Sequence, residues 1–503
     1  MNWGSPYYIF AWLAAYLVVT AWVAWKYSTG VETEEDYYVA GRSVGPFANT
    51  MSIVATIASG GIYLGTVGFF YDHGVNFLGY GFAYVCLVFG LWFVGRRLWP
   101  VGKKFNYSTP QDFYGDFYQS EFLRLFGAVG SIIFLIPYYA SNAVAMGFVL
   151  ERFAGLPYVW GVWLLVVFTV VYTTYGGMRA VIYTDVLQGV ILLLFGIVAV
   201  FVILNAVGGY TKLMDDLPPK MTVHGTDWAA YGLFIGWIVF MFSHPLTLSD
   251  RMTRMYTIRS LGAFRTNVLL TGGALLMVCL VFVLLGMASQ KIMGPGIKPN
   301  DEAILGAIQR HAPWLMAWMV VVVWACGMST MDSGLVGADA MLSKDIIRRY
   351  IKPDISDSQL VRIGRWAMIV FGLLAAWIAL QRPPGIWALV RLVVMFHMQF
   401  LPMLILGLYW KRASKLGAEV GWAVGVILGT YYTFWASGPP PINVGGAPAP
   451  GFFALLVNFI LFVVISLLSS PPPAAHRAKF EEAWSALPEP EPGREGERVK
   501  VTA

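Results

Sequence analysis

Long apolar runs separated by short charged groups fill most of the 503-residue chain. A hydrocarbon core of about 30 Å requires roughly 20 apolar residues to cross it as a helix, and thirteen runs approach that length. They lie near 6–26, 47–71, 76–95, 125–150, 157–175, 180–206, 230–249, 266–289, 314–343, 364–381, 386–410, 417–437 and 452–470. The pattern predicts an all-α integral membrane domain of about thirteen transmembrane helices over residues 1–470.

The composition changes after residue 470. The segment 471–503 is rich in proline, glutamate and charge, and such a composition cannot bury enough apolar surface to fold by itself. The sequence predicts a disordered cytoplasmic tail with a short helix around 480–487.

Basic residues are distributed unequally between the two sides of the predicted bundle. With the amino terminus outside, the inner loops and tail hold 26 of the 34 lysines and arginines and the outer loops hold 7, while Arg391 falls inside a run. Lysine and arginine accumulate in cytoplasmic loops. We therefore predict an outside amino terminus, a cytoplasmic carboxyl terminus, and a multi-pass protein of the plasma membrane, which is the inner membrane in a bacterium.

Composition excludes several classes of protein. Hydrophobic residues make up 58% and charged residues 12% of the chain, about half the charge of a soluble domain. The net charge of +6 suits nucleic acid, but binding of that kind needs basic residues clustered on one solvated face. Three cysteines inside apolar runs and six scattered histidines favour neither disulfides nor a metalloenzyme. No enzyme activity, organic cofactor or nucleic-acid partner is predicted.

Two predicted spans are interrupted near their middle. The second contains Ser59-Gly60-Gly61 and the seventh contains Pro245; glycine costs a helix about 1 kcal/mol relative to alanine, and proline removes a helical donor. The interruptions fall in the first helix of each of two five-helix units, 47–206 and 230–410, which would form an inverted repeat. Secondary transporters place their binding sites at such breaks, whereas close packing through small residues is the alternative.

A third polar cluster lies in the ninth predicted span, with hydroxyls at Ser329, Thr330 and Ser333 and a carboxylate at Asp332. Hard oxygen ligands suit a hard cation, although helical hydroxyls also bond their own backbone. An intramembrane carboxylate is costly and needs a partner. The cluster therefore indicates a cation site.

Four motifs carry a resemblance to a known family. They are Tyr175-Gly176-Gly177-Met178-Arg179-Ala180-Val181-Ile182-Tyr183-Thr184-Asp185-Val186-Leu187-Gln188, Met328-Ser329-Thr330-Met331-Asp332-Ser333, Leu408-Tyr409-Trp410-Lys411-Arg412 with Gly417-Ala418, and Asp36-Tyr37-Tyr38-Val39-Ala40-Gly41-Arg42. From about residue 30 to 435 the chain resembles the sodium:solute symporters, which include proline, pantothenate, monocarboxylate, sialic acid and sodium/glucose carriers.

The resemblance implies a LeuT-type five-plus-five inverted repeat with one helix before it and two after, and sodium-coupled solute uptake by alternating access. It implies a sodium site built from carbonyls of Ala55, Ala58 and Cys326 and hydroxyls of Ser329 and Thr330. It also implies a second cation or coupling site at Asp185, Asp332 and Ser333. A structural or gating network is the alternative for these last three residues.

The chain departs from the family where substrate is chosen. Ile57 stands where proline carriers have an aspartate, and sugar-binding polar positions align with Gly60, Gly61, Gly81 and Ile238. Each lost buried hydrogen bond would cost a sugar roughly 1–3 kcal/mol, which disfavours sugars. The predicted substrate-binding residues are Ser59, Gly60, Gly61, Tyr63, Ile238, Met241, Phe242 and Arg391, with Phe240 and Tyr138 as further apolar contacts.

Arg391 is the charged member of that set. A guanidinium binds a carboxylate through two hydrogen bonds, but a long basic side chain can also snorkel to the membrane surface. His397 is interpreted as a packing residue rather than a gate. The prediction is a sodium symporter, expected to be monomeric, that imports a small organic solute, with an organic acid such as a monocarboxylate or a pantothenate-like compound favoured. A proline-like amino acid, a sugar and proton coupling through Asp185 and Asp332 remain alternatives, and a sensor or a channel is less favoured.

Overall fold

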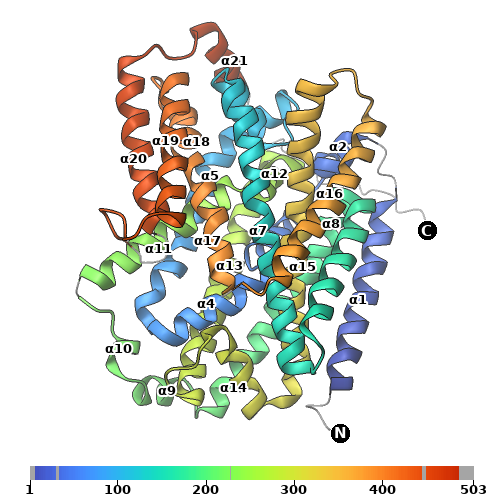
Figure 1. Cartoon of the computed structure of the whole chain (residues 1–503), viewed down its shortest axis with the longest axis vertical. Coiled ribbons are helices and arrows are strands. Elements are labelled where there is room, and N and C mark those ends of the chain that lie inside the picture. Colours follow the sequence, from blue (N-terminus) through green and yellow to red (C-terminus); the bar gives the residue numbers. More distant parts are fainter. Residues whose placement is uncertain (1–5, 30–32, 227, 384, 445–448, 486–503) are drawn as a thin grey trace.

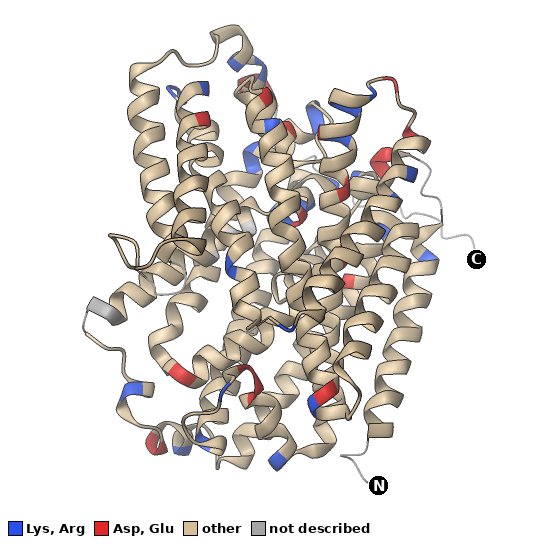
Figure 2. Ribbon diagram, in the orientation of Figure 1, with Lys and Arg blue, Asp and Glu red and all other residues tan. Residues whose placement is uncertain are grey.

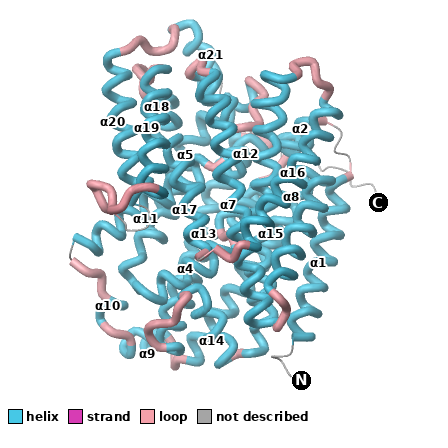
Figure 3. The backbone as a smooth tube through the Cα atoms, in the orientation of Figure 1, coloured by secondary structure: helices cyan, strands magenta, loops and turns pink. Residues whose placement is uncertain are grey.

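The computed structural model describes residues 6–29, 33–226, 228–383, 385–444 and 449–485, and gives only the backbone of 228, 229, 241, 244 and 245. Helices form almost all of this part of the chain (Figure 3), and the one β-bridge among the described residues pairs Val44 with Ile258. Charged residues gather at the two ends of the helical bundle and are sparse between them, as a membrane-spanning bundle requires (Figure 2).

The helices that fill or adjoin the predicted spans run mostly along the vertical axis of the view (Figure 1). They are α1 (Pro6–Ser28), α3 (Pro46–Ile57), α4 (Gly60–His73), α5 (Leu78–Lys104), α7 (Glu121–Ala154), α8 (Tyr158–Ala206), α11 (Trp228–Thr247), α12 (Ser249–Thr257), α13 (Leu261–Met293), α15 (Met316–Ala340), α16 (Asp357–Leu380), α17 (Ile386–His397), α18 (Leu401–Tyr409), α19 (Lys415–Phe434) and α20 (Ala449–Leu468).

Nine helical stretches of the described chain are long and apolar enough to cross a membrane. They contain eleven of the thirteen predicted runs, because Gly60–Lys104 and Tyr158–Ala206 each take in more than one. The other two runs correspond to α11 and α19. Every predicted run is therefore mainly helical, with a break at Ala58 and Ser59 in the second one.

Shorter helices lie at the two ends of the bundle. α9 (Tyr210–Asp216), α10 (Pro219–Thr222) and α14 (Ala303–His311) lie at the end where α1 begins (Figure 1). At the opposite end are α2 (Glu34–Val39), α6 (Pro110–Phe117) and α21 (Ala474–Ser485). The predicted orientation would put the first group outside and the second inside.

The first predicted break is present. α3 ends at Ile57 and α4 begins at Gly60, with Ala58 (φ −83°, ψ 43°) and Ser59 (φ −45°, ψ 155°) outside helical geometry. The Ser59 hydroxyl accepts a hydrogen bond from the backbone N–H of Ile62 and so caps α4. The helix breaks where the capping Ser59 is followed by two glycines, Gly60 and Gly61.

The second break does not lie at Pro245, where the sequence predicts it. The backbone of α11 stays helical through Pro245 to Thr247, and Leu248 (φ −69°, ψ 141°) is the extended residue that separates α11 from α12. A proline removes only one hydrogen bond and can be accommodated within a membrane helix. The correction moves the break three residues toward α12.

The two broken helices are joined at their charged end. The backbone N–H of Val44, before α3, donates to the carbonyl of Thr257 at the end of α12, and the N–H of Arg259 donates back to Val44. α3 also packs on α8 and α13, and α15 packs on α7 and α8. These contacts place the first break, α12 and α15 together in the interior.

The tail differs from the prediction. Its helix, α21, begins at Ala474, six residues before the predicted start, and Phe480 is buried against Phe105 and Phe117 at ring-centroid distances of 5.2 and 5.1 Å. A segment that cannot fold alone can fold against an apolar surface. Residues 486–503 lie outside the described part of the chain.

Candidate functional site

The carbonyls at the end of α3 meet the hydroxyls of α15. Ser329 Oγ lies 2.9 Å from the Ala55 oxygen and 3.1 Å from the Cys326 oxygen. Thr330 Oγ1 lies 3.1 Å from the Thr56 oxygen and 3.0 Å from the Cys326 oxygen. Each hydroxyl carries one proton and two lone pairs, so each can bond a carbonyl or turn a lone pair toward a cation. The structure brings four of the five predicted sodium ligands into one buried cluster.

Ala58, the fifth predicted ligand, is the first non-helical residue after α3. The start of α4 just beyond it is held against α15, since a Cβ on Gly60 would lie 3.1 Å from the Val323 oxygen and 3.4 Å from the Gly327 Cα. The Gly60 N–H donates to Asn142 Oδ1 of α7 at 3.1 Å. Because Gly60 has no side chain, the backbones of α4 and α15 can approach closely. Asn142, which sequence reasoning missed, holds the break in place through this hydrogen bond.

The second predicted cation site contains an arginine. Arg254 of α12 donates from Nη2 to Asp185 Oδ2 at 2.8 Å and to Ser333 Oγ at 2.5 Å. Its Nε donates to Ser52 Oγ at 2.7 Å, and Ser52 Oγ in turn donates to Asp185 Oδ2 at 2.5 Å. The side chains of Arg254 and Asp185 are fully buried. The sequence places Arg254 among the inner-face charges and does not pair it with Asp185.

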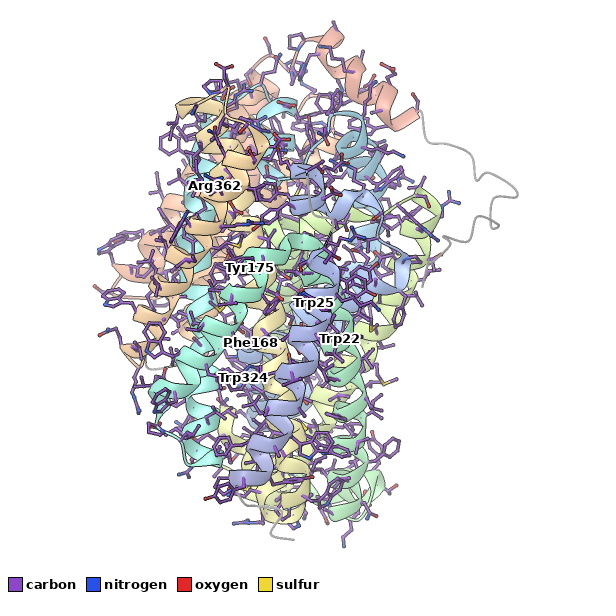
Figure 4. All side chains as sticks on the ribbon, turned by 90° about the vertical axis from the view of Figure 1, so that its right-hand side faces the viewer. Trp22, Trp25, Phe168, Tyr175, Trp324 and Arg362 are labelled. Carbon is purple, nitrogen blue, oxygen red and sulfur yellow. The ribbon has the colours of Figure 1, made fainter. Side chains whose placement is uncertain are left out.

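Asp332, the third residue of that predicted site, faces α8. The Tyr172 hydroxyl donates to Asp332 Oδ2, and the backbone and side chain of Ser333 donate to Oδ1. Tyr172 also lines an apolar groove between α1 and α8. Figure 4 shows Trp25 of α1 beside Phe168 and Tyr175 of α8 at this groove.

A second buried arginine lies just after the second break. Arg251 donates from Nη2 to the Thr56 carbonyl at 2.8 Å and to the Tyr138 hydroxyl at 3.1 Å, and from Nη1 to Asp250 Oδ1 at 3.3 Å. Its Nε and Asp250 Oδ2 have no hydrogen-bond partner among the described residues. Cations are favoured at the carbonyl end of a helix, so Arg251 ties α12 to the end of α3.

Arg391 of α17 is exposed and lines a cavity of about 50 Å³ together with Phe240 of α11, Met395, and residues of α19 and α20. It makes no ion pair with a described residue. Its guanidinium is therefore available to a carboxylate that enters this cavity.

The other predicted substrate residues are dispersed. Tyr63 packs edge-on against Phe282 of α13 at 5.1 Å, and Phe242 lies against Gly90 of α5. A Cβ on Gly61 would lie 2.5 Å from Ile386 of α17. Ser59 serves as the cap of α4, Ile238 is partly buried, and the side chain of Met241 lies outside the described residues. Among the described residues of this set, the contacts therefore go to three different helices, α5, α13 and α17.

Sequence reasoning missed an aromatic cluster beside the first break. The rings of Trp237 and Trp387 are 5.2 Å apart, and Phe69 lies 5.3 Å from Trp237 and 5.6 Å from Trp387. A Cβ on Gly65 would lie 1.8 Å from Trp387 Nε1. Trp387 precedes Arg391 by one helical turn, and that spacing is the signal that would have associated the two.

His397 lies where the sequence predicts a packing residue. Its Nδ1 is 2.8 Å from the carbonyl of Val393, and its ring packs edge-on against Phe396 at 5.2 Å. The His397 ring is buried and bonds to the preceding turn of its own helix. These are the features of a side chain that packs within the bundle.

The sequence profile of the sodium:solute symporter family matches residues 37–425. The chain belongs to this family. It is similar to the sodium/proline symporter of Salmonella typhimurium, with 24% identity over 93% of this chain and 94% of that protein. It is also similar to the sodium/pantothenate symporter of Escherichia coli, with 26% identity over 83% of this chain and 88% of that protein. The sodium/glucose cotransporter of Vibrio parahaemolyticus is 24% identical over 92% of this chain and 90% of that protein.

Among solved structures, the chain is similar to the substrate-bound outward-open state of a Na⁺-coupled sialic acid symporter, with a TM-score of 0.79 and 20% identity over 92% of this chain and 98% of that one. The similarity shows the fold, so the predicted LeuT-type architecture is confirmed. This family member is a multi-pass membrane transporter and not an enzyme.

Proposed function

We propose that this symporter imports a small solute that carries a carboxylate, together with sodium, with a proline-like amino acid as the first candidate. The observation that carries the sodium coupling is the cluster of neutral oxygens from Ala55, Cys326, Ser329 and Thr330 at the first break. Neutral hydroxyl and carbonyl oxygens bind a hard cation without a carboxylate's charge, so the ion can leave on the inner side.

Two findings support a carboxylate. Arg391 lines the cavity beside Phe240 without an ion-pair partner among the described residues, and a guanidinium binds a carboxylate in a fork of two hydrogen bonds. Relatives named for proline and for pantothenate match nearly the whole chain, and both of those solutes carry a carboxylate. Sodium/proline symporters recur among the relatives, which favours a proline-like amino acid over the organic acid predicted from sequence.

A pantothenate-like compound or a monocarboxylate is the second candidate. No aspartate or glutamate lines the Arg391 cavity among the described residues, so an acid without an ammonium group would leave no charge unmatched there. A sugar differs from such an acid because its hydroxyls would face a mainly apolar lining, where burying unpaired polar groups is costly.

The test is uptake by the purified chain in liposomes. With an inward sodium gradient, labelled proline, pantothenate, a monocarboxylate and glucose are offered in turn. Accumulation of a carboxylate solute that stops when sodium is equal on both sides supports the proposal. Accumulation driven equally by a proton gradient would contradict sodium coupling, and glucose as the only solute taken up would contradict the substrate class. The Arg391→Gln variant should lose uptake while Arg382→Gln, at a surface ion pair with Glu151, should keep it.

A further inference from the structure

The oxygens around the buried ion pair of Arg254 and Asp185 resemble those of a cation site. The cation here is the guanidinium of Arg254, which is part of the chain. Three side-chain oxygens from other helices surround the guanidinium: Asp185 Oδ2 at 2.8 Å, Ser52 Oγ at 2.7 Å and Ser333 Oγ at 2.5 Å. They come from α8, α3 and α15, and one of them carries a full negative charge. A carboxylate and two hydroxyls are ligands that a sodium ion would accept.

Burial limits this cluster to one cation. Arg254 and Asp185 are both fully buried, and charges in a low-dielectric interior interact several times more strongly than in water. One positive charge neutralises Asp185, while the neighbouring Asp332 accepts its hydrogen bonds from the Tyr172 hydroxyl and from Ser333. A sodium ion added to the same oxygens would lie beside the guanidinium, and their repulsion would exceed what the already paired carboxylate could offset.

We propose that Arg254 acts as a tethered cation at the cluster formed by Asp185, Ser52 and Ser333, so that this chain binds one sodium ion, at the Ser329–Thr330 site, and no second one. The inference rests on the proposed sodium coupling. It assigns Arg254 as the residue that sets the ratio of sodium to solute.

The attachment of this cation has a mechanical consequence. Arg254 belongs to α12, and its Nη1 also donates to the Asp250 carbonyl one turn earlier, which holds the side chain against its own helix. The guanidinium therefore fastens α12 to three other helices at once. A free sodium ion would bridge α3, α8 and α15 but would leave α12 unconnected.

The experiment counts sodium ions bound per chain, by equilibrium dialysis of radioactive sodium against the full-length protein in detergent without solute. The wild type should bind one. Arg254→Ala leaves Asp185 without its charge and opens space for an ion, so it should bind two. The double variant Asp185→Asn with Arg254→Ala removes the negative charge as well and should return to one. Arg254→Lys, which keeps a tethered cation, should also bind one.

Each other outcome has a distinct meaning. Two ions in the wild type would overturn the tethered cation and leave the sodium-coupled symport intact. No ion in the wild type would overturn the sodium coupling itself. One ion in Arg254→Ala would make the arginine a structural partner only. If Arg254→Ala fails to fold, Arg254→Gln, which keeps most of the side-chain volume but not the charge, decides: two bound ions support the tethered cation, and one bound ion makes the arginine a structural partner only.

Discussion

At the scale of the residue, the hydroxyls of Ser329 and Thr330 have two roles that compete for the same oxygens. Both bond carbonyls at the end of α3, so they hold α15 against the first break. A sodium ion would take the same carbonyls and the hydroxyl lone pairs. Sodium binding and the contact between α3 and α15 are therefore coupled through two side chains.

Thr330→Ala tests this coupling. It removes one ligand and one contact, and we expect the sodium concentration for half-maximal uptake to rise about tenfold, which corresponds to about 1.4 kcal/mol. Thr330→Ser keeps the hydroxyl and should stay within a factor of about two to three of the wild type. Uptake measured against sodium concentration in liposomes gives the result. Equal sodium dependence in Thr330→Ala and the wild type would remove Thr330 from the site.

Asp301, which lies outside the membrane spans, has a raised pKa. Burial, with Glu302 and Asp72 nearby, raises the pKa of Asp301 to about 6. A carboxyl group whose pKa is raised in the folded state favours folding when protonated, so its stabilising contribution is complete below about pH 4 and is lost as the pH rises through 6. Its neighbour Asn300 bonds Asp72 of α4 at 2.7 Å, which couples this titration to α4.

We expect the thermal unfolding midpoint of the purified wild type to fall between pH 5 and pH 7.5 by more than that of Asp301→Asn. At pH 7.5 the variant should be the more stable of the two, because it carries no charge at the buried position. Asp354→Asn, at an exposed position in the loop before α16, is the control. Parallel pH profiles for the wild type and Asp301→Asn would contradict the assignment.

At the scale of the element, sequence predicted what depends on neighbours along the chain. Ser59, Gly60 and Gly61 are consecutive, so the first break could be located within two residues. The sodium ligands on α15 lie within five residues of one another, so their shared face followed from helical periodicity. The second break was misplaced because a proline marks a missing hydrogen bond and not the residue at which a helix ends.

The sequence could not identify contacts between residues that are distant along the chain. Arg254 is 69 residues from Asp185 and 202 residues from Ser52. An arginine just past an apolar run is normally a cytoplasmic charge, and only the packing of α12 into the bundle buries this one. Sequence also could not tell which predicted substrate residues share a cavity, because helix rotation decides which face of α4 and α11 meets it.

The bend of α8 is a further element-scale prediction. Gly177 has φ 55° and ψ −158°, and a Cβ there would lie 2.7 Å from the Tyr37 oxygen. Gly177→Ala should cost about 1–3 kcal/mol in backbone strain together with that overlap, and should lower the thermal midpoint in detergent. Gly155→Ala is the matched control, because Gly155 also has a positive φ of 67° but nothing within 4 Å. An equal effect of the two substitutions would show that the contact with Tyr37 is unimportant.

At the scale of the whole molecule, the carboxyl-terminal segment holds together parts of the chain that lie far apart. Lys104 at the end of α5 pairs with Glu482 at 2.9 Å, Arg477 donates to the carbonyl of Lys411, and His476 Nε2 lies 2.9 Å from the Asp116 carbonyl. α21 therefore connects α5, α6 and the loop between α18 and α19 at the charged end of the bundle.

Phe480 holds α21 in place. It is 2% exposed and packs between Phe105 and Phe117, and replacing a buried phenylalanine with alanine costs about 3–5 kcal/mol. Because α21 cannot fold alone, that loss should release the helix without unfolding the bundle. Limited proteolysis with trypsin should then cut within 474–485, at Arg477 or Lys479, at least about tenfold faster in Phe480→Ala than in the wild type, while Ala478→Ser, at an exposed position, leaves the rate unchanged. Proteolysis equally slow in Phe480→Ala would mean that the ion pairs, and not the phenylalanine, hold the segment in place.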